Sequence, residues 1–211
     1  MGEQATPDKV IPDIVVGRLP LYLRALQRML EQNQLITSSQ DLAERLGISA
    51  AQIRKDLSQF GEFGKQGTGY DVAYLVDQLR KILKVNRVWD IAVVGAGDIG
   101  SAIARYQGFA DRGFRVAMIF DNDPRKIGVK IGEFIVKDTA TMVDAIRNAG
   151  IQIAMIAVPA ANAQAVVDEL VKAGVKAILN YAPTYINAPE DVHIQHTDPV
   201  THLQRMTYYL D

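Results

Sequence analysis

Apolar residues recur with helical spacing over the first part of the chain. The first such run predicts a helix that begins near Pro20, a residue suited to the first turn of a helix. Its apolar positions are Leu21, Leu23, Leu26, Met29 and Leu30. Residues 1–17 show no clear period, so we expect a loose arm there.

Two shorter helices follow, joined by a tight turn. Ser38 begins an N-cap pattern for a helix that ends at Gly47, and Ser49 caps a further helix that extends to Phe60. The apolar face of this further helix holds Ile53, Leu57 and Phe60. A short glycine-containing turn between two short helices is typical of the helix-turn-helix. The pattern therefore predicts a DNA-binding unit with residues 49–60 as its recognition helix.

The next ten residues, 61–70, include four glycines and two aromatic side chains. This composition predicts a small hairpin, the wing of a winged-helix domain. Asp71 can cap a fourth helix, whose apolar positions run from Val72 to Leu83. We expect a domain boundary near residues 84–87 and a winged-helix domain over residues 1–85.

From Val88 onward, short apolar runs alternate with helical patterns. The expected strands are 91–94, 116–120, 153–158 and 177–179, and the expected helices lie near 99–109, 139–148 and 160–172. Such alternation predicts an α/β fold, a doubly wound parallel sheet of the Rossmann type, over residues 86–198. A last helix, with apolar residues at helical spacing, is expected within 199–211.

A glycine-rich turn follows the first of these strands. Its sequence is Gly95, Ala96, Gly97, Asp98, Ile99 and Gly100. Strand, glycine turn and helix in this order are the context in which the motif binds dinucleotides. The first glycine permits a tight turn, the second lets the backbone approach a pyrophosphate, and the third allows close packing of helix and strand. Free N–H groups at the helix start would point at the phosphates.

The dinucleotide fold also requires an acid at the end of the second strand, about 20 residues further on. Asp121 occupies this position and would accept hydrogen bonds from the adenosine ribose. Arg125 and Lys126 follow closely and could favour a 2′-phosphate, but the charge of Asp121 would repel one. We therefore expect NAD(H) rather than NADP(H), with Lys126 among the cofactor contacts. The alternative is a glycine turn that binds no ligand.

Two further segments lie at expected strand ends, where ligands bind in doubly wound sheets. The candidate cofactor contacts in them are Ala157, Val158 and Pro159, and then Asn180, Ala182 and Pro183. Small residues there would leave room for the nicotinamide. Both segments could instead be ordinary turns.

The candidate DNA contacts lie on the expected recognition helix and wing. They are Ser49, Gln52, Arg54, Lys55, Ser58, Phe60 and Lys65. Arginine can pair with guanine through two hydrogen bonds, and lysine, serine and glutamine suit phosphates or base edges. The alternative is a solvated amphipathic helix in a small helical domain.

Composition narrows the class of protein. The chain has 211 residues, a net charge of −1 and no cysteine, which excludes disulfides and thiolate metal sites. No stretch approaches the ~20 apolar residues of a membrane span, and the polar N-terminus predicts no secretory signal. We expect a cytoplasmic protein that contacts neither membrane nor metal. DNA binding would then depend on where the cations lie rather than on their number.

Several stretches together closely resemble the Rex family of redox-sensing transcriptional repressors, essentially from end to end. They are residues 18–24, 53–58 with Phe60 and Gly61, 67–70, 95–100, 120–121, 158–159 and 178–183. The resemblance implies a homodimer with a winged-helix and a Rossmann domain. It also implies a repressor of respiratory and fermentative genes that binds palindromic operators. In this family NADH releases the DNA, and NAD⁺ competes with NADH.

The same resemblance implies an exchanged C-terminal helix and three switch residues. By matching position they are Arg24, Tyr106 and Asp198, with Asp198 paired to Arg24 in one state and to Tyr106 in the other. Pro199 stands where some members place an aromatic residue, so stacking on the partner's nicotinamide is not implied here.

Two other function classes remain open at this point. One is a small NAD-dependent dehydrogenase, which needs a general acid–base; only His196 with Asp198 offers one, and we expect both to be surface residues. The other is a CoA-binding Rossmann domain, since such domains share the glycine turn. We expect a regulator rather than an enzyme.

Overall fold

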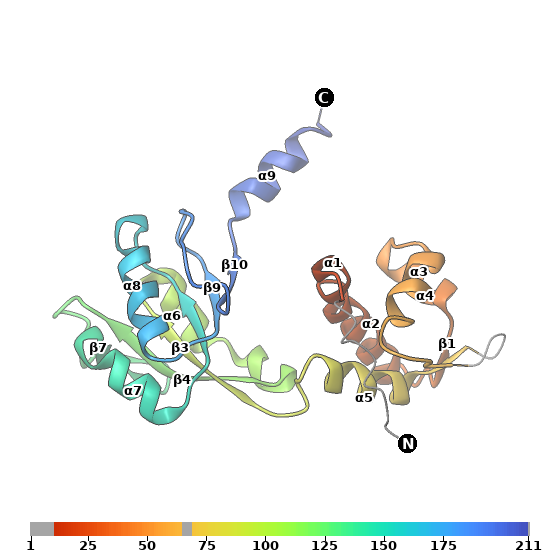
Figure 1. Cartoon of the computed structure of the whole chain (residues 1–211), viewed down its shortest axis with the longest axis horizontal. Coiled ribbons are helices and arrows are strands. Elements are labelled where there is room, and N and C mark those ends of the chain that lie inside the picture. The colour runs from red at the N-terminus through yellow and green to blue at the C-terminus, as the bar shows by residue number, and fades with distance from the viewer. Residues whose placement is uncertain (1–10, 65–68, 211) are drawn as a thin grey trace, which may run out of the picture. The chain divides into compact units, whose positions relative to one another are not determined.

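The computed structural model describes residues 11–64 and 69–210 (Figure 1). It divides the chain into two compact units, with the boundary between Arg87 and Val88. Each unit has its own hydrophobic core.

Helices dominate the first unit. They are α1 (Asp13–Val16), α2 (Leu19–Glu31), α3 (Ser39–Leu46), α4 (Ala50–Leu57) and α5 (Val72–Ile82). Helix α1 replaces part of the loose arm expected before residue 17, and α4 ends at Leu57 rather than at Phe60. The apolar faces of α2, α3, α4 and α5 meet in one core, in which Tyr22, Leu26, Met29, Leu42, Ile53 and Leu75 are fully buried.

Local capping explains where these helices begin and end. The Ser38 hydroxyl accepts a hydrogen bond from the Asp41 N–H while the Asp41 carboxylate accepts one from the Ser38 N–H, a capping box. Gly47 ends α3 in the left-handed conformation, with φ of 66°. Ser49 caps α4, as the sequence predicts. The turn between α3 and α4 is therefore specified by its own residues.

A two-stranded antiparallel sheet completes this unit. Strand β1 (Ile36–Thr37) pairs with β2 (Tyr70–Asp71), so that Tyr70 lies opposite Thr37. Of the described part of the expected wing, residues 61–64 and 69–70, only Tyr70 lies in a strand, and it pairs with the segment before α3. Residues 65–68, including Lys65, lie outside the described residues.

A six-stranded parallel sheet organises the second unit, in the order β10-β9-β8-β3-β4-β7. Its strands are β3 (Trp89–Val94), β4 (Phe114–Asp121), β7 (Lys137–Asp138), β8 (Ile153–Ile156), β9 (Ala177–Asn180) and β10 (His193–His196). Reading along the chain, this is the doubly wound order 3-2-1-4-5-6 seen from the other edge. After β3, the chain first adds β4 and β7 on one side and then returns to add β8, β9 and β10 on the other side. The strand order therefore reverses between β3 and β8.

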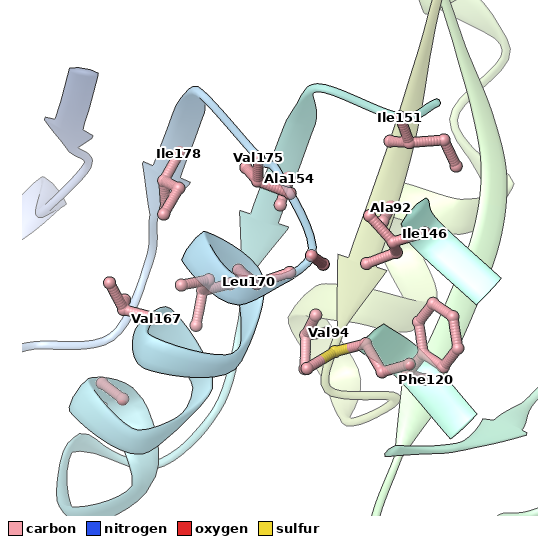
Figure 2. Packing of buried hydrophobic residues seen from close by; sticks show 14 of the residues in the cluster. Ala92, Val94, Phe120, Ile146, Ile151, Ala154, Val167, Leu170, Val175 and Ile178 are labelled. Atoms are coloured by element: carbon pink, nitrogen blue, oxygen red, sulfur yellow. The ribbon is translucent and has the colours of Figure 1, made fainter. Parts of the chain in front are cut away.

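Helices cover both faces of the sheet. Ala92 and Val94 of β3 pack in the core under α7 (Met142–Ala149) and α8 (Ala160–Lys172), with Phe120 and Ile146 (Figure 2). The alternate residues of β3, Ile91 and Val93, join a second core with α6 (Asp98–Arg105). Successive side chains of β3 point to opposite faces of the sheet, so this one strand contributes apolar residues to the cores on both faces.

Smaller elements extend this unit. The helix expected near 99–109 ends at Arg105, and a 3-10 helix, Gln107–Arg112, follows. A hairpin of β5 (Lys130–Ile131) and β6 (Phe134–Ile135) and a short 3-10 helix, Thr139–Thr141, precede α7. Helix α9 (Pro199–Thr207) is exposed along its whole length. Among the described residues, no helix is long and apolar enough to cross a membrane.

Candidate functional site

A cleft of about 680 Å³ opens at the carboxyl ends of the central strands of the second unit. Gly95 follows β3, Asp121 ends β4, and Ala157 follows β8, and all three line the cleft. The strand order reverses between the neighbouring strands β3 and β8. The cleft therefore lies at the topological switch point, where doubly wound sheets bind ligands.

The three glycines of the turn meet different constraints. A Cβ on Gly100 would lie 1.7 Å from the Gly95 carbonyl oxygen, and one on Gly95 would lie 2.3 Å from the Ala157 carbonyl oxygen. Gly95 also has a φ of 100°, which L residues rarely adopt. A Cβ on Gly97 would meet nothing within 4 Å. Gly95 and Gly100 are thus required by the fold itself, while Gly97 leaves open space beside the cleft.

Asp121 is buried and fully engaged with the turn. Its carboxylate accepts hydrogen bonds from the Ala96 N–H at 2.7 Å, the Asp123 N–H at 2.8 Å and the Lys126 ammonium at 3.1 Å. Burial alone raises the pKa of Asp121, but these donors stabilise the carboxylate more and lower its pKa below the ordinary value. A carboxylate accepts about four hydrogen bonds, so capacity for a ribose hydroxyl remains.

Both cations near the end of β4 are already paired with acids. Lys126 forms its ion pair with Asp121, and Arg125 holds Asp123 at 2.7 Å. The Arg125 guanidinium lowers the pKa of Asp123 to about 2. Neither cation is left to balance a 2′-phosphate, which favours a dinucleotide without one.

Most predicted cofactor contacts line the cleft. These are Gly95, Gly97, Asp98, Ile99, Asp121, Lys126, Ala157, Val158 and Pro159. Ala96 and Gly100 belong to the turn but are buried behind it. The cleft is also lined by residues that the sequence pattern does not indicate. They are Asn122, Asp123, Thr139, Met142, Asn162, Ala165, Val166 and Glu169. Asn122 and Asp123 directly follow β4, whereas Met142 of α7 and the residues of α8 reach the cleft only through the packing of these helices.

The segment after β9 is not part of this lining. Asn180 is 1% exposed, and its amide nitrogen donates to the carbonyl oxygens of Ala182 and Thr184 and lies 3.1 Å from Nδ1 of His196. Ala182 and Pro183 line a separate hollow of about 240 Å³ that also includes Asp198. Asn180 therefore shapes the loop after β9, and its contact with a cofactor stays a prediction.

The second candidate surface is the outer face of α4. Arg54, Lys55 and Ser58 are exposed there, and the Arg54 guanidinium donates to the Ser39 hydroxyl at 2.9 Å. Ser49 caps the helix through its hydroxyl, and Phe60 packs partly against the core. This face presents two cations and one hydroxyl, groups that suit a phosphate backbone or base edges.

The predicted switch residues are placed as follows. Arg24 is exposed on α2 and forms no ion pair with another described residue. Tyr106 is 49% exposed at the end of α6, with its ring edge-on to Phe109. Asp198 caps α9 by accepting a hydrogen bond from the Val200 N–H at 2.9 Å. Within the described part of the second unit, no hydrogen bond joins Tyr106 to Asp198.

His196 and Asp198, the one candidate acid–base pair for a dehydrogenase, do not form a pair. His196 contacts the Asn180 amide and the Tyr185 ring, and no hydrogen bond links it to Asp198 in the described chain. No group of three or more His, Cys, Asp or Glu residues that could hold a metal ion occurs among the described residues.

Comparison with known proteins covers both units. A family model described as "Putative DNA-binding protein N-terminus" matches residues 10–58, and one described as "CoA binding domain" matches residues 86–184. The chain is 50% identical over 199 residues to the redox-sensing transcriptional repressor Rex of Chloroflexus aggregans (strain MD-66 / DSM 9485), covering 94% of both chains. It is 43% identical to the protein of that name from Streptomyces coelicolor (strain ATCC BAA-471 / A3(2) / M145), covering 97% of this chain and 80% of the relative.

Solved structures agree with this picture. The crystal structure of RSP in complex with beta-NAD⁺ and operator DNA matches with a TM-score of 0.91 and 39% identity, covering 96% of this chain and 94% of that chain. RSP in complex with beta-NADH matches with a TM-score of 0.87 and 37% identity, covering 96% of this chain and 95% of that one. The predicted fold class, an N-terminal DNA-binding domain followed by a Rossmann domain, is confirmed.

Proposed function

The chain belongs to the Rex family of redox-sensing transcriptional repressors, and from this membership we propose that it binds operator DNA through its first unit under the control of NAD(H) bound in its second. The reduced cofactor, NADH, releases the DNA, and NAD⁺ leaves the repressor competent to bind. A change in the NADH/NAD⁺ balance thereby becomes a change in transcription.

The observation that carries this proposal is the dinucleotide cleft of about 680 Å³ in a chain that also holds a capped helix-turn-helix. Helix α6 begins at the glycine turn, so its free N–H groups face the cleft where a pyrophosphate would lie. In the relative RSP, beta-NAD⁺ and operator DNA occupy one complex. The same two kinds of ligand fit the two candidate surfaces here.

The proposal extends to the assembly and its targets. The repressor acts as a homodimer, because a palindromic operator presents two half-sites at a fixed spacing. Exchange of α9 between subunits would cover its apolar residues. We include in the proposal a cytoplasmic location, operators upstream of respiratory and fermentative genes, and the alternative pairing of Asp198 with Arg24 and Tyr106.

The cofactor is expected to be sensed rather than consumed. Among the described residues that line the cleft, the ionisable side chains are Asp98, Asp121, Asp123, Lys126 and Glu169. Four of them already pair within the protein, since Asp121 holds Lys126, Asp123 holds Arg125 and Glu169 holds Lys172. Hydride transfer to a substrate needs a free proton donor near the nicotinamide.

CoA is the second candidate ligand, favoured by the family model that matches residues 86–184. Calorimetric titration of the full chain with NADH, repeated in the presence of CoA and of NADPH, distinguishes the ligands. We expect NADH to bind in the micromolar range or tighter, displaced by NAD⁺ but not by CoA. Tight CoA binding without NADH binding would overturn the sensor function.

A further inference from the structure

The recognition helix carries a buried acid that the DNA contacts alone do not explain. Asp56 of α4 is 0% exposed, and an ionised carboxylate in such a place needs compensation. Its oxygen Oδ2 accepts hydrogen bonds from Nε of Arg18 and from the Tyr22 hydroxyl, both at 2.6 Å. Its oxygen Oδ1 accepts from Nη2 of Arg18 at 2.8 Å and from the Gln52 amide at 2.7 Å.

These four hydrogen bonds use the whole accepting capacity of the carboxylate. Burial raises the pKa of Asp56, but the donors Arg18, Tyr22 and Gln52 lower it further than burial raises it. The group is therefore a charged acceptor, and only an N–H or O–H can face it. We call Arg18, Tyr22, Gln52 and Asp56 the Asp56 network.

One member of this network is also a candidate DNA contact. Gln52 lies in the first turn of α4, at the border between the buried and the exposed faces, and is partly exposed. In helix-turn-helix proteins, residues at the N-terminal end of the recognition helix contact base edges in the major groove.

The Asp56 network fixes which way the Gln52 amide points. Because Asp56 can only accept, the amide must turn its nitrogen toward Oδ1, and a flipped amide would place two oxygens together. One N–H is consumed in this way. The oxygen Oε1 receives no hydrogen bond from a described residue, so Oε1 and the second N–H remain available.

The free Oε1 and N–H of Gln52 form an acceptor beside a donor, and this pair complements one base edge in the major groove. Adenine presents its N6 amino group as a donor next to N7 as an acceptor, and glutamine pairs with both. We propose that Asp56 is a positioning residue that holds Gln52 in the one orientation suited to recognising an adenine in each operator half-site. This inference rests on the DNA-binding function proposed above.

The test uses the full-length chain and duplexes obtained by binding selection from a randomised library. Each position of the selected palindrome is substituted symmetrically, and affinity is measured by fluorescence anisotropy at one salt concentration. For the wild type we expect one adenine per half-site whose replacement weakens binding roughly 5- to 150-fold and whose preference depends on Gln52. Gln52→Ala and Asp56→Asn should both abolish the preference at that same position.

Tyr22→Phe is the matched control. It removes a donor to Oδ2, the oxygen that does not hold Gln52, and it perturbs the same buried acid. If Asp56 acts only on stability, Tyr22→Phe and Asp56→Asn should alter the base preferences alike. We expect Tyr22→Phe to keep the adenine preference and Asp56→Asn to lose it, with both variants retaining their affinity for unrelated DNA.

A second measurement does not require Asp56→Asn to fold. Nitrogen-15 relaxation of the Gln52 side-chain amide in the wild type should report an ordered group, and a freely rotating amide would overturn the positioning role. Operator binding with base preferences unchanged in Gln52→Ala would overturn the adenine assignment while leaving the repressor function intact. Failure of the selection to enrich any duplex would instead refute DNA binding, and this inference with it.

Discussion

The carboxylate of Asp121, at the end of β4, accepts a hydrogen bond at 2.7 Å from the backbone N–H of Ala96 in the glycine turn. An acid expected to contact the ribose thus also fixes the loop that we expect to face the pyrophosphate. The two roles are compatible, because a buried carboxylate that holds the turn in place prepares it for the ligand before binding.

Asp121→Asn should weaken NADH binding by about 10- to 100-fold. The amide nitrogen would face an N–H donor or the Lys126 ammonium, and an unsatisfied buried group costs about 1–3 kcal/mol. Calorimetric titration with NADH measures the loss. Asp90→Asn is the control, since Asp90 belongs to a surface ion pair with Arg115 away from the cleft lining; equal losses in both variants would contradict the role of Asp121.

Gly97→Ala and Gly100→Ala should separate ligand binding from folding. A methyl group at Gly97 meets no protein atom within 4 Å, whereas one at Gly100 overlaps the Gly95 carbonyl oxygen. We expect Gly97→Ala to change stability by less than about 0.5 kcal/mol while weakening NADH binding at least tenfold. Gly100→Ala should lower the melting temperature by several degrees without any ligand present. Normal NADH affinity in Gly97→Ala would show that the pyrophosphate lies elsewhere.

Lys55 is exposed on α4 and, among the described residues, has no ion pair. If it contacts a phosphate, Lys55→Ala should reduce the slope of log affinity against log salt by about 0.9 for each phosphate contact. Affinity should fall for all DNA sequences alike. Lys81→Ala, which breaks an exposed pair with Asp77 on α5, serves as the control and should leave the slope unchanged.

Helix α9 exposes Val200, Leu203 and Met206, each more than half accessible in the single chain. Burial of one such side chain contributes about 1.5–3 kcal/mol, so a partner subunit that covers them gains stability. Leu203→Lys should shift the assembly from dimer to monomer, as measured by analytical ultracentrifugation. Gln204→Lys, one position further along the helix, should not. A dimer of unchanged stability in Leu203→Lys would exclude α9 from the interface.

Acid should weaken the first unit through Asp56. Its folded pKa lies below the ordinary value, so the stabilisation is fully present above about pH 5 and is lost as the pH falls through the lowered pKa. Asp56→Asn should lower the free energy of unfolding at pH 7 by on the order of 3 kcal/mol. It should also remove the part of the pH dependence of stability that comes from protonation of Asp56. Urea unfolding followed by far-ultraviolet circular dichroism at several pH values measures both effects. Asp77→Asn, in an exposed pair of the same unit, should keep the wild-type dependence.

Local signals in the sequence account for much of the fold. Ser38, Ser49 and Asp71 each cap the helix that the sequence predicts, because a cap depends only on neighbours within a few residues. Short apolar runs likewise predict strands β3, β4, β8 and β9, because such a run is visible in the local sequence alone. Strand β10 (His193–His196) was missed, since an edge strand with polar residues lacks an apolar run.

Contacts distant in sequence explain the rest. Met142 and Val166 line the cleft only because α7 and α8 pack beside it, and no motif marks them. The bonds from Arg18 and Tyr22 to Asp56 span more than 30 residues. In the sequence Gln52 is one polar position among several, and only the folded chain shows which atom of its amide is engaged.

The measurement that tests the central claim most directly is operator release by the cofactor. The full chain is bound to a labelled duplex obtained by selection, and anisotropy is followed at fixed salt during titration with NADH and, separately, with NAD⁺. We predict that NADH weakens DNA binding roughly 5- to 150-fold, a coupling of about 1–3 kcal/mol, and that NAD⁺ at the same concentration does not. Equal DNA affinity with and without saturating NADH would contradict the account.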